Sequence, residues 1–217
     1  MAQFAVIGLG RFGSTASLEL IRLGHQVLGV DAEPKYINRL ADRLSYAVIA
    51  DATDEQALAE LDLCRYDAVL VAIGENLEAS ILCVLHLKNL GVQQLWVKAS
   101  SKPHHSILSR LGVSRIIHPE EEMGIKVAQA LVYPMINQYL FLGHNLYLVE
   151  VRVDRHLEGT TLSALLTGTG HEVKTVLVKR QSQLLAPVPD PFVLATDDCL
   201  VLAGPLSILK SLAPRLG

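Results

Sequence analysis

Three glycines near the amino terminus have the spacing of a phosphate-binding turn. They are Gly8, Gly10 and Gly13, and an apolar run leads into them. A second apolar run ends on Asp31, at the distance of about 20 residues where dinucleotide-binding sequences carry an acid for the ribose hydroxyls. Without a Cβ, glycine lets backbone amides approach a pyrophosphate closely. The pattern therefore predicts an adenine-nucleotide site.

Arg11 stands inside this glycine turn. A guanidinium there could bind terminal phosphates through two hydrogen bonds, which suits ATP or ADP better than the buried pyrophosphate of NAD. The alternative is an exposed arginine on the first helical turn with no ligand. Asp31 would repel a 2′-phosphate, so NADP is disfavoured.

Strand and helix signals alternate up to about residue 118, and this alternation must position the turn. We expect strands at Gln3–Ile7, Gln26–Val30, Ala47–Ile49, Ala68–Ile73, Leu95–Lys98 and Arg115–Ile117. Gly24, Gly91 and Gly112 each follow a helical pattern, where a left-handed cap is needed. The pattern predicts an α/β fold with a Rossmann-like, doubly wound parallel sheet.

Ligands on such sheets bind beyond the carboxyl ends of the strands. The segments at those ends are Gly8–Gly13, Asp31-Ala32-Glu33, Asp51-Ala52-Thr53, Ile73-Gly74-Glu75-Asn76 and Lys98-Ala99-Ser100. Asp51, Thr53 and Asn76 also precede helices, where capping and ligand contact can hold together. Lys98 would face the phosphates, and His104, near the start of the next helix, could touch the nucleotide.

Residues 119–140 are expected to form a long crossover helix after the last strand. Pro119 suits the first helical position, and Glu120–Glu122 complement the helix dipole there. We expect Pro134 to kink or end the helix. One apolar face carries Met123, Val127, Ala130, Leu131 and Met135. This face needs a second lobe or a second subunit to cover it.

The remaining residues, 141–217, predict a small α+β lobe. Strands are expected at Tyr147–Val153, Glu172–Lys179 and Leu200–Ala203, with short helices opened by Leu157–Leu162 and at Ser207–Leu212. A unit of roughly 75 residues is small for an independent domain, so it often depends on a partner copy. The expected domains are thus 1–118, 119–140 and 141–217.

The composition excludes several classes of protein. The chain has 217 residues, a net charge of −3 and no basic cluster, so we expect no nucleic-acid partner. No apolar run approaches the roughly 20 residues of a membrane helix, and no signal peptide is visible, so we expect a cytoplasmic protein. Cys64, Cys83 and Cys199 have apolar neighbours, which suits buried thiols in a reducing compartment.

Motifs for catalysis are missing from the sequence. It has no GxSxG elbow, no GxxxxGKS loop and no Cys/His spacing typical of a metal site. A dehydrogenase would need a substrate domain that brings an acid–base residue to the nicotinamide, and the second lobe is small and mostly apolar. We therefore expect a nucleotide sensor and not an enzyme. An NAD(H)-binding redox sensor, an NAD-dependent oxidoreductase, and a structural partner with a vestigial site remain as alternatives.

Several strings jointly carry a family resemblance: Phe4–Gly13, Ala72–Gly74, Trp96–Ala99, Arg115–Glu120 and Asp198–Val201. With them the whole chain resembles the regulators of potassium conductance (RCK proteins) of the Ktr and Trk potassium uptake systems. The resemblance implies a TrkA-N lobe, a crossover helix and a TrkA-C lobe that mediates dimerisation. It also implies a cytoplasmic homo-oligomeric ring, usually an octamer, docked on a separate membrane-embedded potassium-translocating subunit. By this resemblance, ATP would favour the activating shape of the ring and ADP would not. NAD or NADH are alternative ligands.

The same resemblance implies a set of nucleotide-binding residues. They are Gly8, Gly10, Arg11, Phe12, Gly13, Asp31, Ala32, Glu33, Asp51, Ala52, Thr53, Ile73, Gly74, Glu75, Lys98, Ala99, Ser100, His104 and Glu120. Arg11 would contact phosphates, including the terminal phosphate in a neighbouring subunit's site. Glu120 would lie near the phosphates at the subunit junction, where Mg²⁺ or Ca²⁺ can bind.

Two positions depart from the family pattern. Glu33 and Asp51 stand where relatives often carry Asn, and the added negative charge would need compensation by Arg11, Lys98 or a cation. Some relatives bind cyclic di-AMP in the second lobe. Residues Leu165–Gly170 lack the basic residue that its phosphates would need, so this ligand is not expected.

Overall fold

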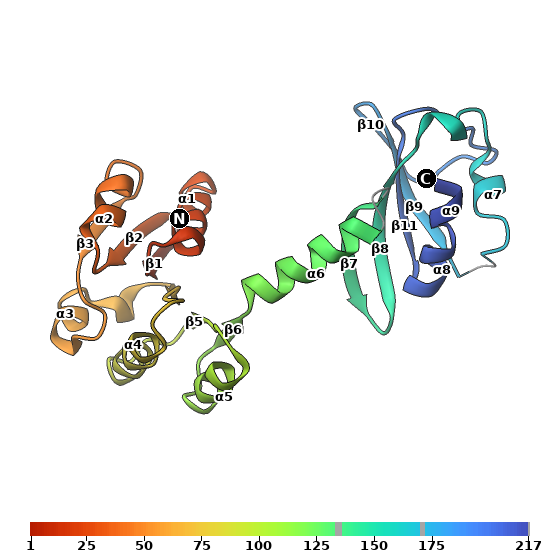
Figure 1. Cartoon of the computed structure of the whole chain (residues 1–217). Helices are drawn as coiled ribbons and strands as arrows, with labels where there is room; N and C mark the ends of the chain where they lie inside the picture. The colour runs from red at the N-terminus through yellow and green to blue at the C-terminus, as the bar shows by residue number, and fades with distance from the viewer. Residues whose placement is uncertain (133–135, 170–171, 217) are drawn as a thin grey trace. The chain divides into compact units, whose positions relative to one another are not determined.

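A six-stranded parallel sheet forms the centre of the first of two units, Met1–Glu120 (Figure 1). The strand order is β3-β2-β1-β4-β5-β6. The strands are β1 Gln3–Ile7, β2 Gln26–Asp31, β3 Tyr46–Ile49, β4 Ala68–Val71, β5 Leu95–Lys98 and β6 Arg115–Ile117. Because β1 pairs with β2 on one side and with β4 on the other, the winding reverses at β1. The predicted doubly wound sheet is confirmed, with small shifts at the strand ends.

The computed structural model describes residues 1–132, 136–169 and 172–216. In the first unit the helices are α1 Arg11–Arg22, α2 Pro34–Leu40, α3 Glu55–Glu60, α4 Leu77–Asn89 and α5 Lys102–Arg110, with a 3₁₀ turn at Leu63–Arg65. Successive residues of β1 belong to different apolar clusters: Val6 lies in one, and Ala5 and Ile7 lie in the other. The sheet is therefore buried on both faces, which explains the apolar excess of the sequence.

Local signals set the ends of several helices. The predicted left-handed caps at Gly24, Gly91 and Gly112 are confirmed by φ values of +86°, +84° and +65°. Asn76 caps α4, since its side chain accepts a hydrogen bond from the Ala79 amide at 3.0 Å. The three glycines end helices and Asn76 begins one. Each cap therefore fixes where a helix meets its loop.

The crossover helix is shorter than expected. α6 runs from Pro119 to Val132, and residues 136–140, which we expected to be helical, belong to the strand β7 (Ile136–Gly143). Pro134 and Met135 lie outside the described residues. β7 forms an antiparallel hairpin with β8 (Leu146–Arg152), and a turn with positive φ at Gly143, His144 and Asn145 joins the two strands. Pairing with β8 outweighs the local helical pattern here.

The second unit, Glu121–Gly217, is built on an antiparallel sheet in the order β10-β9-β11-β8-β7. Besides β7 and β8 its elements are a 3₁₀ turn at Arg155–Leu157, α7 Leu162–Leu165, β9 Lys174–Arg180, β10 Gln183–Leu185, β11 Cys199–Pro205, α8 Leu206–Ser211 and α9 Ala213–Leu216. One face of the sheet contributes Val149, Val151, Val178, Leu200 and Leu202 to a core that includes Leu209, Leu212 and Leu216. The predicted small α+β lobe is confirmed.

The cysteines only partly match our expectation. Cys83 is fully buried in α4, and burial raises the pKa of its thiol to about 12. Cys64, which we expected to be buried, is exposed on the 3₁₀ turn after α3 and donates a hydrogen bond to Asp62. All three thiols are free, so the fold carries no disulfide among its cysteines.

Candidate functional site

The glycine turn joins β1 to α1, and its three glycines have three different roles. Gly8 has a φ of +92°, and a Cβ there would come within 3.0 Å of the Ala72 and Ile73 backbone. A Cβ on Gly13 would collide with the Gly8 carbonyl, so Gly13 lets α1 pack closely against the strand. At Gly10 an added Cβ would meet no atom within 4 Å. The turn is thus closed on the protein side and open in front of the first amides of α1, which have no acceptor inside the helix.

Asp31, at the end of β2, binds the backbone of two loops. Its Oδ2 accepts a hydrogen bond from the Leu9 amide at 2.6 Å, and its Oδ1 accepts one from the Glu33 amide at 2.9 Å. A carboxylate oxygen can accept more than one hydrogen bond, so both oxygens retain capacity for ribose hydroxyls. Ala32 and Glu33 are exposed beside it. The side chain therefore lies at the predicted place and also holds the glycine turn.

Asp51 and Thr53 contact each other after β3. The Asp51 carboxylate accepts hydrogen bonds from the Thr53 amide at 2.9 Å and from its hydroxyl at 2.8 Å, and these bonds hold the pKa of Asp51 below its ordinary value. Neither residue caps α3: the side chain of Asp54 accepts hydrogen bonds from Gln56 and Ala57 instead. Ala52 between them is buried. Our capping alternative was therefore wrong for Asp51 and Thr53, because the turn places Asp54 at the helix start.

Lys98, at the end of β5, is the centre of a charged cluster. Its Nζ lies 2.5 Å from the Glu120 carboxylate and 5.9 Å from the centroid of the Phe12 ring. A Cβ on Gly74 would lie only 3.0 Å from this Nζ, so the glycine leaves room for the ammonium group. The Lys98 side chain is only 13% exposed, whereas that of Glu120 is 70% exposed. The structure thus brings residues that follow β1, β4, β5 and β6 into one cluster; Ile73 and Glu75 flank Gly74 in the loop after β4.

The charges around Glu120 favour its ionised form. Partial burial raises the pKa of Glu120, but a hydrogen bond from Lys98 and the positive charges of Lys98 and Arg11 outweigh it, and the pKa lies below its ordinary value. Arg11 is exposed in the first turn of α1, beside the open side of the glycine turn. Two cations and one carboxylate therefore surround the edge where phosphates were predicted.

His104 is fully buried, in the first turn of α5. Its Nδ1 accepts a hydrogen bond from the Ser100 amide at 3.2 Å, next to the buried Ala99. Burial, together with the charge of His118, lowers the pKa of His104 and so favours the neutral ring. Because Nδ1 accepts the Ser100 hydrogen bond, the neutral ring carries its proton on Nε2. In the described part of the chain this Nε2 has no hydrogen-bond partner.

Arg39 and Asp54 were missed by the sequence analysis. Arg39 on α2 donates a hydrogen bond from Nη2 to the Leu9 carbonyl at 3.2 Å, inside the glycine turn. No sequence pattern indicated this contact, because only the packing of α2 beside the turn brings Arg39 and Leu9 together. Asp54 had a signal, since Asp is a preferred N-cap, but Asp51 and Thr53 offered the same chemistry nearby.

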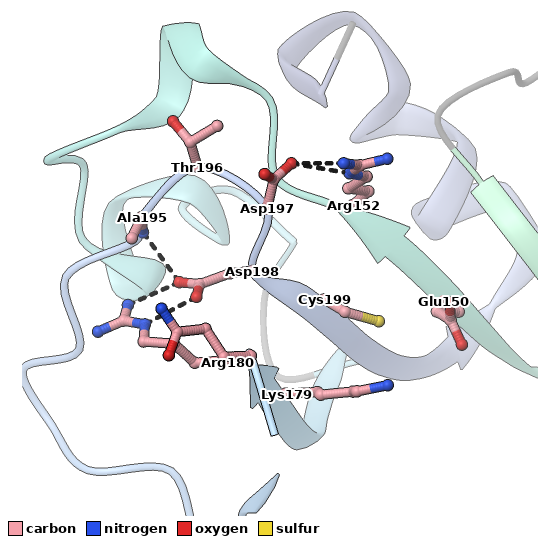
Figure 2. Close-up of a pocket in the computed structure, with 10 residues that line it drawn as sticks. Glu150, Arg152, Lys179, Arg180, Ala195, Thr196, Asp197, Asp198 and Cys199 are labelled. Atoms are coloured by element: carbon pink, nitrogen blue, oxygen red, sulfur yellow. Dashed lines mark hydrogen bonds and ion pairs between the residues drawn. The ribbon is translucent and has the colours of Figure 1, made fainter. Parts of the chain in front are cut away.

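A hollow of about 390 Å³ in the second unit is a different kind of feature (Figure 2). It is lined by Glu150, Arg152, Lys179, Arg180, Gln181, Ala195, Thr196, Asp197, Asp198 and Cys199. Arg152 pairs with Asp197 at 2.6 Å, and Arg180 pairs with Asp198 at 2.6 Å. Burial and a hydrogen bond with Glu150 raise the pKa of Cys199 to about 11, so its thiol is not a ready nucleophile. The charges in the hollow largely satisfy one another.

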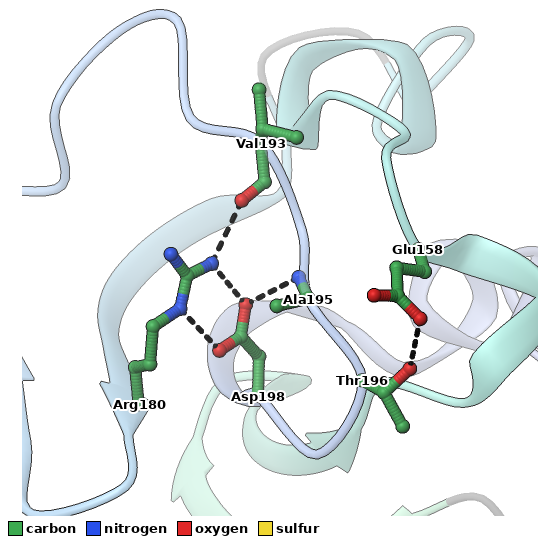
Figure 3. A network of polar contacts seen from close by, with 6 residues as sticks. All are labelled: Glu158, Arg180, Val193, Ala195, Thr196 and Asp198. Atoms are coloured by element: carbon green, nitrogen blue, oxygen red, sulfur yellow. Dashed lines mark hydrogen bonds and ion pairs between the residues drawn. The ribbon is translucent and has the colours of Figure 1, made fainter.

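Asp198 forms the buried part of that network (Figure 3). It is 1% exposed and accepts two hydrogen bonds from Arg180, at 2.7 and 2.6 Å, and one from the Ala195 amide at 2.8 Å. Arg180 also donates to the Val193 carbonyl at 2.8 Å. The network links the end of β9 to the loop before β11 and is best explained as a structural element of the second unit.

Neither a metal site nor a membrane-spanning helix is found among the described residues. Among those residues no group of three or more His, Cys, Asp or Glu side chains is arranged to hold a metal ion. None of the helices there has both the length and the apolarity needed to cross a bilayer. Glu120 remains a single carboxylate with a lysine partner.

The parallel sheet, the glycine turn and the acid at the end of β2 define a nucleotide-binding protein of the Rossmann type. The TrkA-N domain family matches residues 4–119, and the chain belongs to this family. The expected resemblance is therefore confirmed.

Relatives match over nearly the full length of the chain. Ktr system potassium uptake protein A of Bacillus subtilis (strain 168) is 39% identical over 93% of this chain and 91% of its own length. Ktr system potassium uptake protein C of the same organism is 36% identical over 99% of this chain and 97% of its own length. Ktr system potassium uptake protein A of Vibrio alginolyticus is 37% identical over 94% of this chain and 92% of its own length.

A solved structure has the same fold. The crystal structure of the GsuK RCK domain matches all of this chain with a TM-score of 0.65 and 18% identity. This chain covers 48% of that structure's chain, so it spans about half of the larger protein. At this identity the match shows the fold.

Proposed function

We propose that this chain is a nucleotide-binding regulatory subunit that gates a separate potassium-translocating membrane protein from the cytoplasmic side. The names of its relatives, which place them in Ktr potassium uptake systems, support the potassium part of the proposal. The observation that carries the nucleotide part is the cluster of Arg11, Lys98 and Glu120 beside the open glycine turn.

The proposed ligand is ATP or ADP, held at the carboxyl edge of the parallel sheet. The open side of Gly10 and the first amides of α1 fit a polyphosphate, since a helix N-terminus favours negative charge. Asp31 has the free acceptor capacity to bind the ribose. A polyphosphate would supply the negative charge that Arg11 and Lys98 match. The exposed Glu33 and Asp51 carboxylates oppose this charge, so the two cations are essential to binding.

Arg11 would distinguish ATP from ADP through the terminal phosphate, and Lys98 would pass this difference on to α6. This lysine is paired with Glu120, which lies in the first turn of α6. A terminal phosphate would compete with Glu120 for Lys98 and release the carboxylate to Mg²⁺ or Ca²⁺. Occupancy by a triphosphate would thus change the contacts that hold the start of α6, whereas a diphosphate would not. Only such a difference between two ligands can shift a conformational equilibrium.

The proposed assembly is a homo-oligomeric ring built from dimers, with an octamer as the expected size. Met123, Val127 and Leu131 of α6 are 57%, 51% and 79% exposed. Such a row of apolar side chains is stabilised when a second copy covers it. In the ring Arg11 would reach the terminal phosphate of a neighbouring subunit. The second unit would add to dimerisation.

The proposal includes no catalysis. Two of the cations in the hollow of the second unit are paired with carboxylates, Arg152 with Asp197 and Arg180 with Asp198. A second candidate is an NAD(H)-binding redox sensor or a small NAD-dependent oxidoreductase, which Asp31 at the end of β2 would equally suit. One solved neighbour is described as the GsuK channel bound to NAD. The alternative therefore belongs in the test.

Thermal unfolding with ATP, ADP, NAD and NADH, each with and without Mg²⁺, tests the proposal. At a ligand concentration 100 times the Kd, bound nucleotide should stabilise the protein by about 2.7 kcal/mol, which raises the unfolding midpoint by several degrees. We expect such a rise for ATP and for ADP, and at equal concentrations of the two nucleotides the rise should be larger for ATP. Stabilisation by NADH alone, with turnover of a hydroxy or keto substrate, would favour the redox alternative. No rise with any nucleotide would reject a nucleotide-regulated subunit.

A further inference from the structure

The peptide units around Leu9, in the middle of the glycine turn, are held from two sides. The Leu9 amide donates to Asp31 Oδ2 at 2.6 Å, and its carbonyl accepts a hydrogen bond from Arg39 Nη2 at 3.2 Å. The Leu9 side chain is fully buried in the cluster that contains Ile37 and Leu40 of α2. Leu9 is therefore fixed by its amide, its carbonyl and its side chain.

The turn needs this support because of its composition. Leu9 lies between Gly8 and Gly10, and glycine has the largest conformational freedom of any residue. A ligand that binds a mobile turn must order it first, at a cost in affinity. Both glycines are anchored on the protein side: the Gly8 amide donates a hydrogen bond to the Val30 carbonyl at 2.8 Å, and the Gly10 carbonyl accepts hydrogen bonds from the Ser14 amide at 3.0 Å and its hydroxyl at 2.7 Å. Leu9 between them is held by Asp31 at its amide and by Arg39 at its carbonyl.

Arg39 is suited to this role by its own surroundings. Its guanidinium lies over the Tyr36 ring, 5.4 Å from the centroid, and Tyr36 also contacts Lys35. Stacking on an aromatic ring restricts the long side chain, so less freedom is lost when it donates a hydrogen bond. Arg39 is exposed, and the hydrogen bond from its Nη2 ends on a backbone carbonyl, that of Leu9.

We propose that Arg39 is a positioning residue, which fixes the glycine turn in its nucleotide-binding shape through the Leu9 carbonyl without contacting the nucleotide. This inference depends on the proposed function and adds a residue to it. It predicts that Arg39 contributes equally to the affinity for ATP and for ADP, because both nucleotides use the same turn. Arg11, in contrast, would distinguish the two nucleotides.

Two substitutions separate the hydrogen bond from the bulk of the side chain. Arg39→Met keeps the apolar stem and removes the donor, and Arg39→Lys keeps a donor. For Arg39→Met we expect about fivefold weaker binding of both ATP and ADP by calorimetry, the size of one ordinary hydrogen bond. Arg39→Lys should recover part of the loss. Arg43→Met is the matched control, because Arg43 is an exposed cation just after α2.

Hydrogen exchange without nucleotide supplies an independent measurement. Arg39→Met should speed exchange at the Leu9 and Gly10 amides several-fold and leave the β1 amides unchanged. Equal exchange in the turn, or equal loss of affinity in Arg39→Met and Arg43→Met, would overturn the positioning role. If the unmodified protein binds no nucleotide, the proposed function fails, and the exchange experiment still decides whether Arg39 holds the turn.

Discussion

At Gly10 a substitution can affect ligand binding without affecting folding. Its φ of −61° and ψ of −164° are open to any amino acid, and an added Cβ meets nothing within 4 Å. Alanine should therefore fold as well as glycine. The methyl group would project into the space in front of the first α1 amides, where we place the phosphates.

We predict that Gly10→Ala weakens ATP and ADP about tenfold or more, with the unfolding midpoint of the free protein unchanged. Calorimetric titration and thermal unfolding measure the two quantities. The control is Gly124→Ala, another glycine with open space around it, on α6. Unchanged affinity in Gly10→Ala would mean that the nucleotide does not lie against this turn.

At the residue scale the sequence identified side chains that act through short motifs. Asp31 lies where its spacing from the glycines placed it, and Asn76 caps α4 as a helix-start signal allows. Arg39 could not be found this way, because its contact with Leu9 joins residues 30 positions apart and depends on how α2 packs. The burial of His104 depends likewise on tertiary packing.

The pair of Arg180 and Asp198 shows how one element of the second unit is stabilised. The side chains are 38% and 1% exposed. Burial raises the pKa of Asp198, but the hydrogen bonds from Arg180 and Ala195 and the charge of Arg180 outweigh it, and the pKa is lowered. The carboxylate therefore stabilises the folded state above the unfolded Asp pKa of about 3.9, and this contribution is lost as the pH falls through the lowered folded pKa.

We predict that Asp198→Asn lowers the free energy of unfolding by about 3 kcal/mol at pH 7, because Arg180 loses its buried partner. The difference from the unmodified protein should shrink below about pH 4. Denaturant unfolding at several pH values measures both effects. Asp197→Asn is the control: its pair with Arg152 is exposed on both sides, so it should cost less than about 1 kcal/mol. Equal costs for the two variants would contradict a buried role for Asp198.

At the element scale, the periodicity of apolar residues was sufficient to predict the strands and helices of the first unit, but it was insufficient for part of the second unit. The strands of the parallel sheet are continuous apolar runs between glycine caps, so their bounds are local properties. Residues 136–140 of β7 were assigned to the crossover helix, because the partner strand β8 and the turn at Gly143 decide the conformation of β7 and its own sequence does not. Antiparallel pairing is a contact between segments, and a single-segment pattern does not contain it.

At the scale of the whole molecule, α6 connects the proposed nucleotide site to the proposed assembly surface. Its first turn carries Glu120, the partner of Lys98, and its later turns carry the exposed Met123, Val127 and Leu131. A ligand that changes the Lys98–Glu120 pair therefore acts on the same helix that would contact a second copy. In the proposed ring, this arrangement would give a physical route from a bound phosphate to a change in ring shape.

The central claim is that Arg11 distinguishes ATP from ADP. Calorimetric titration of both nucleotides into the assembled protein and into its Arg11→Ala variant tests it most directly. Charge-assisted hydrogen bonds of this kind contribute about 1.5–3 kcal/mol, so Arg11→Ala should weaken ATP by at least tenfold and ADP much less. An equal loss for ATP and ADP, or no loss for either, would contradict the account.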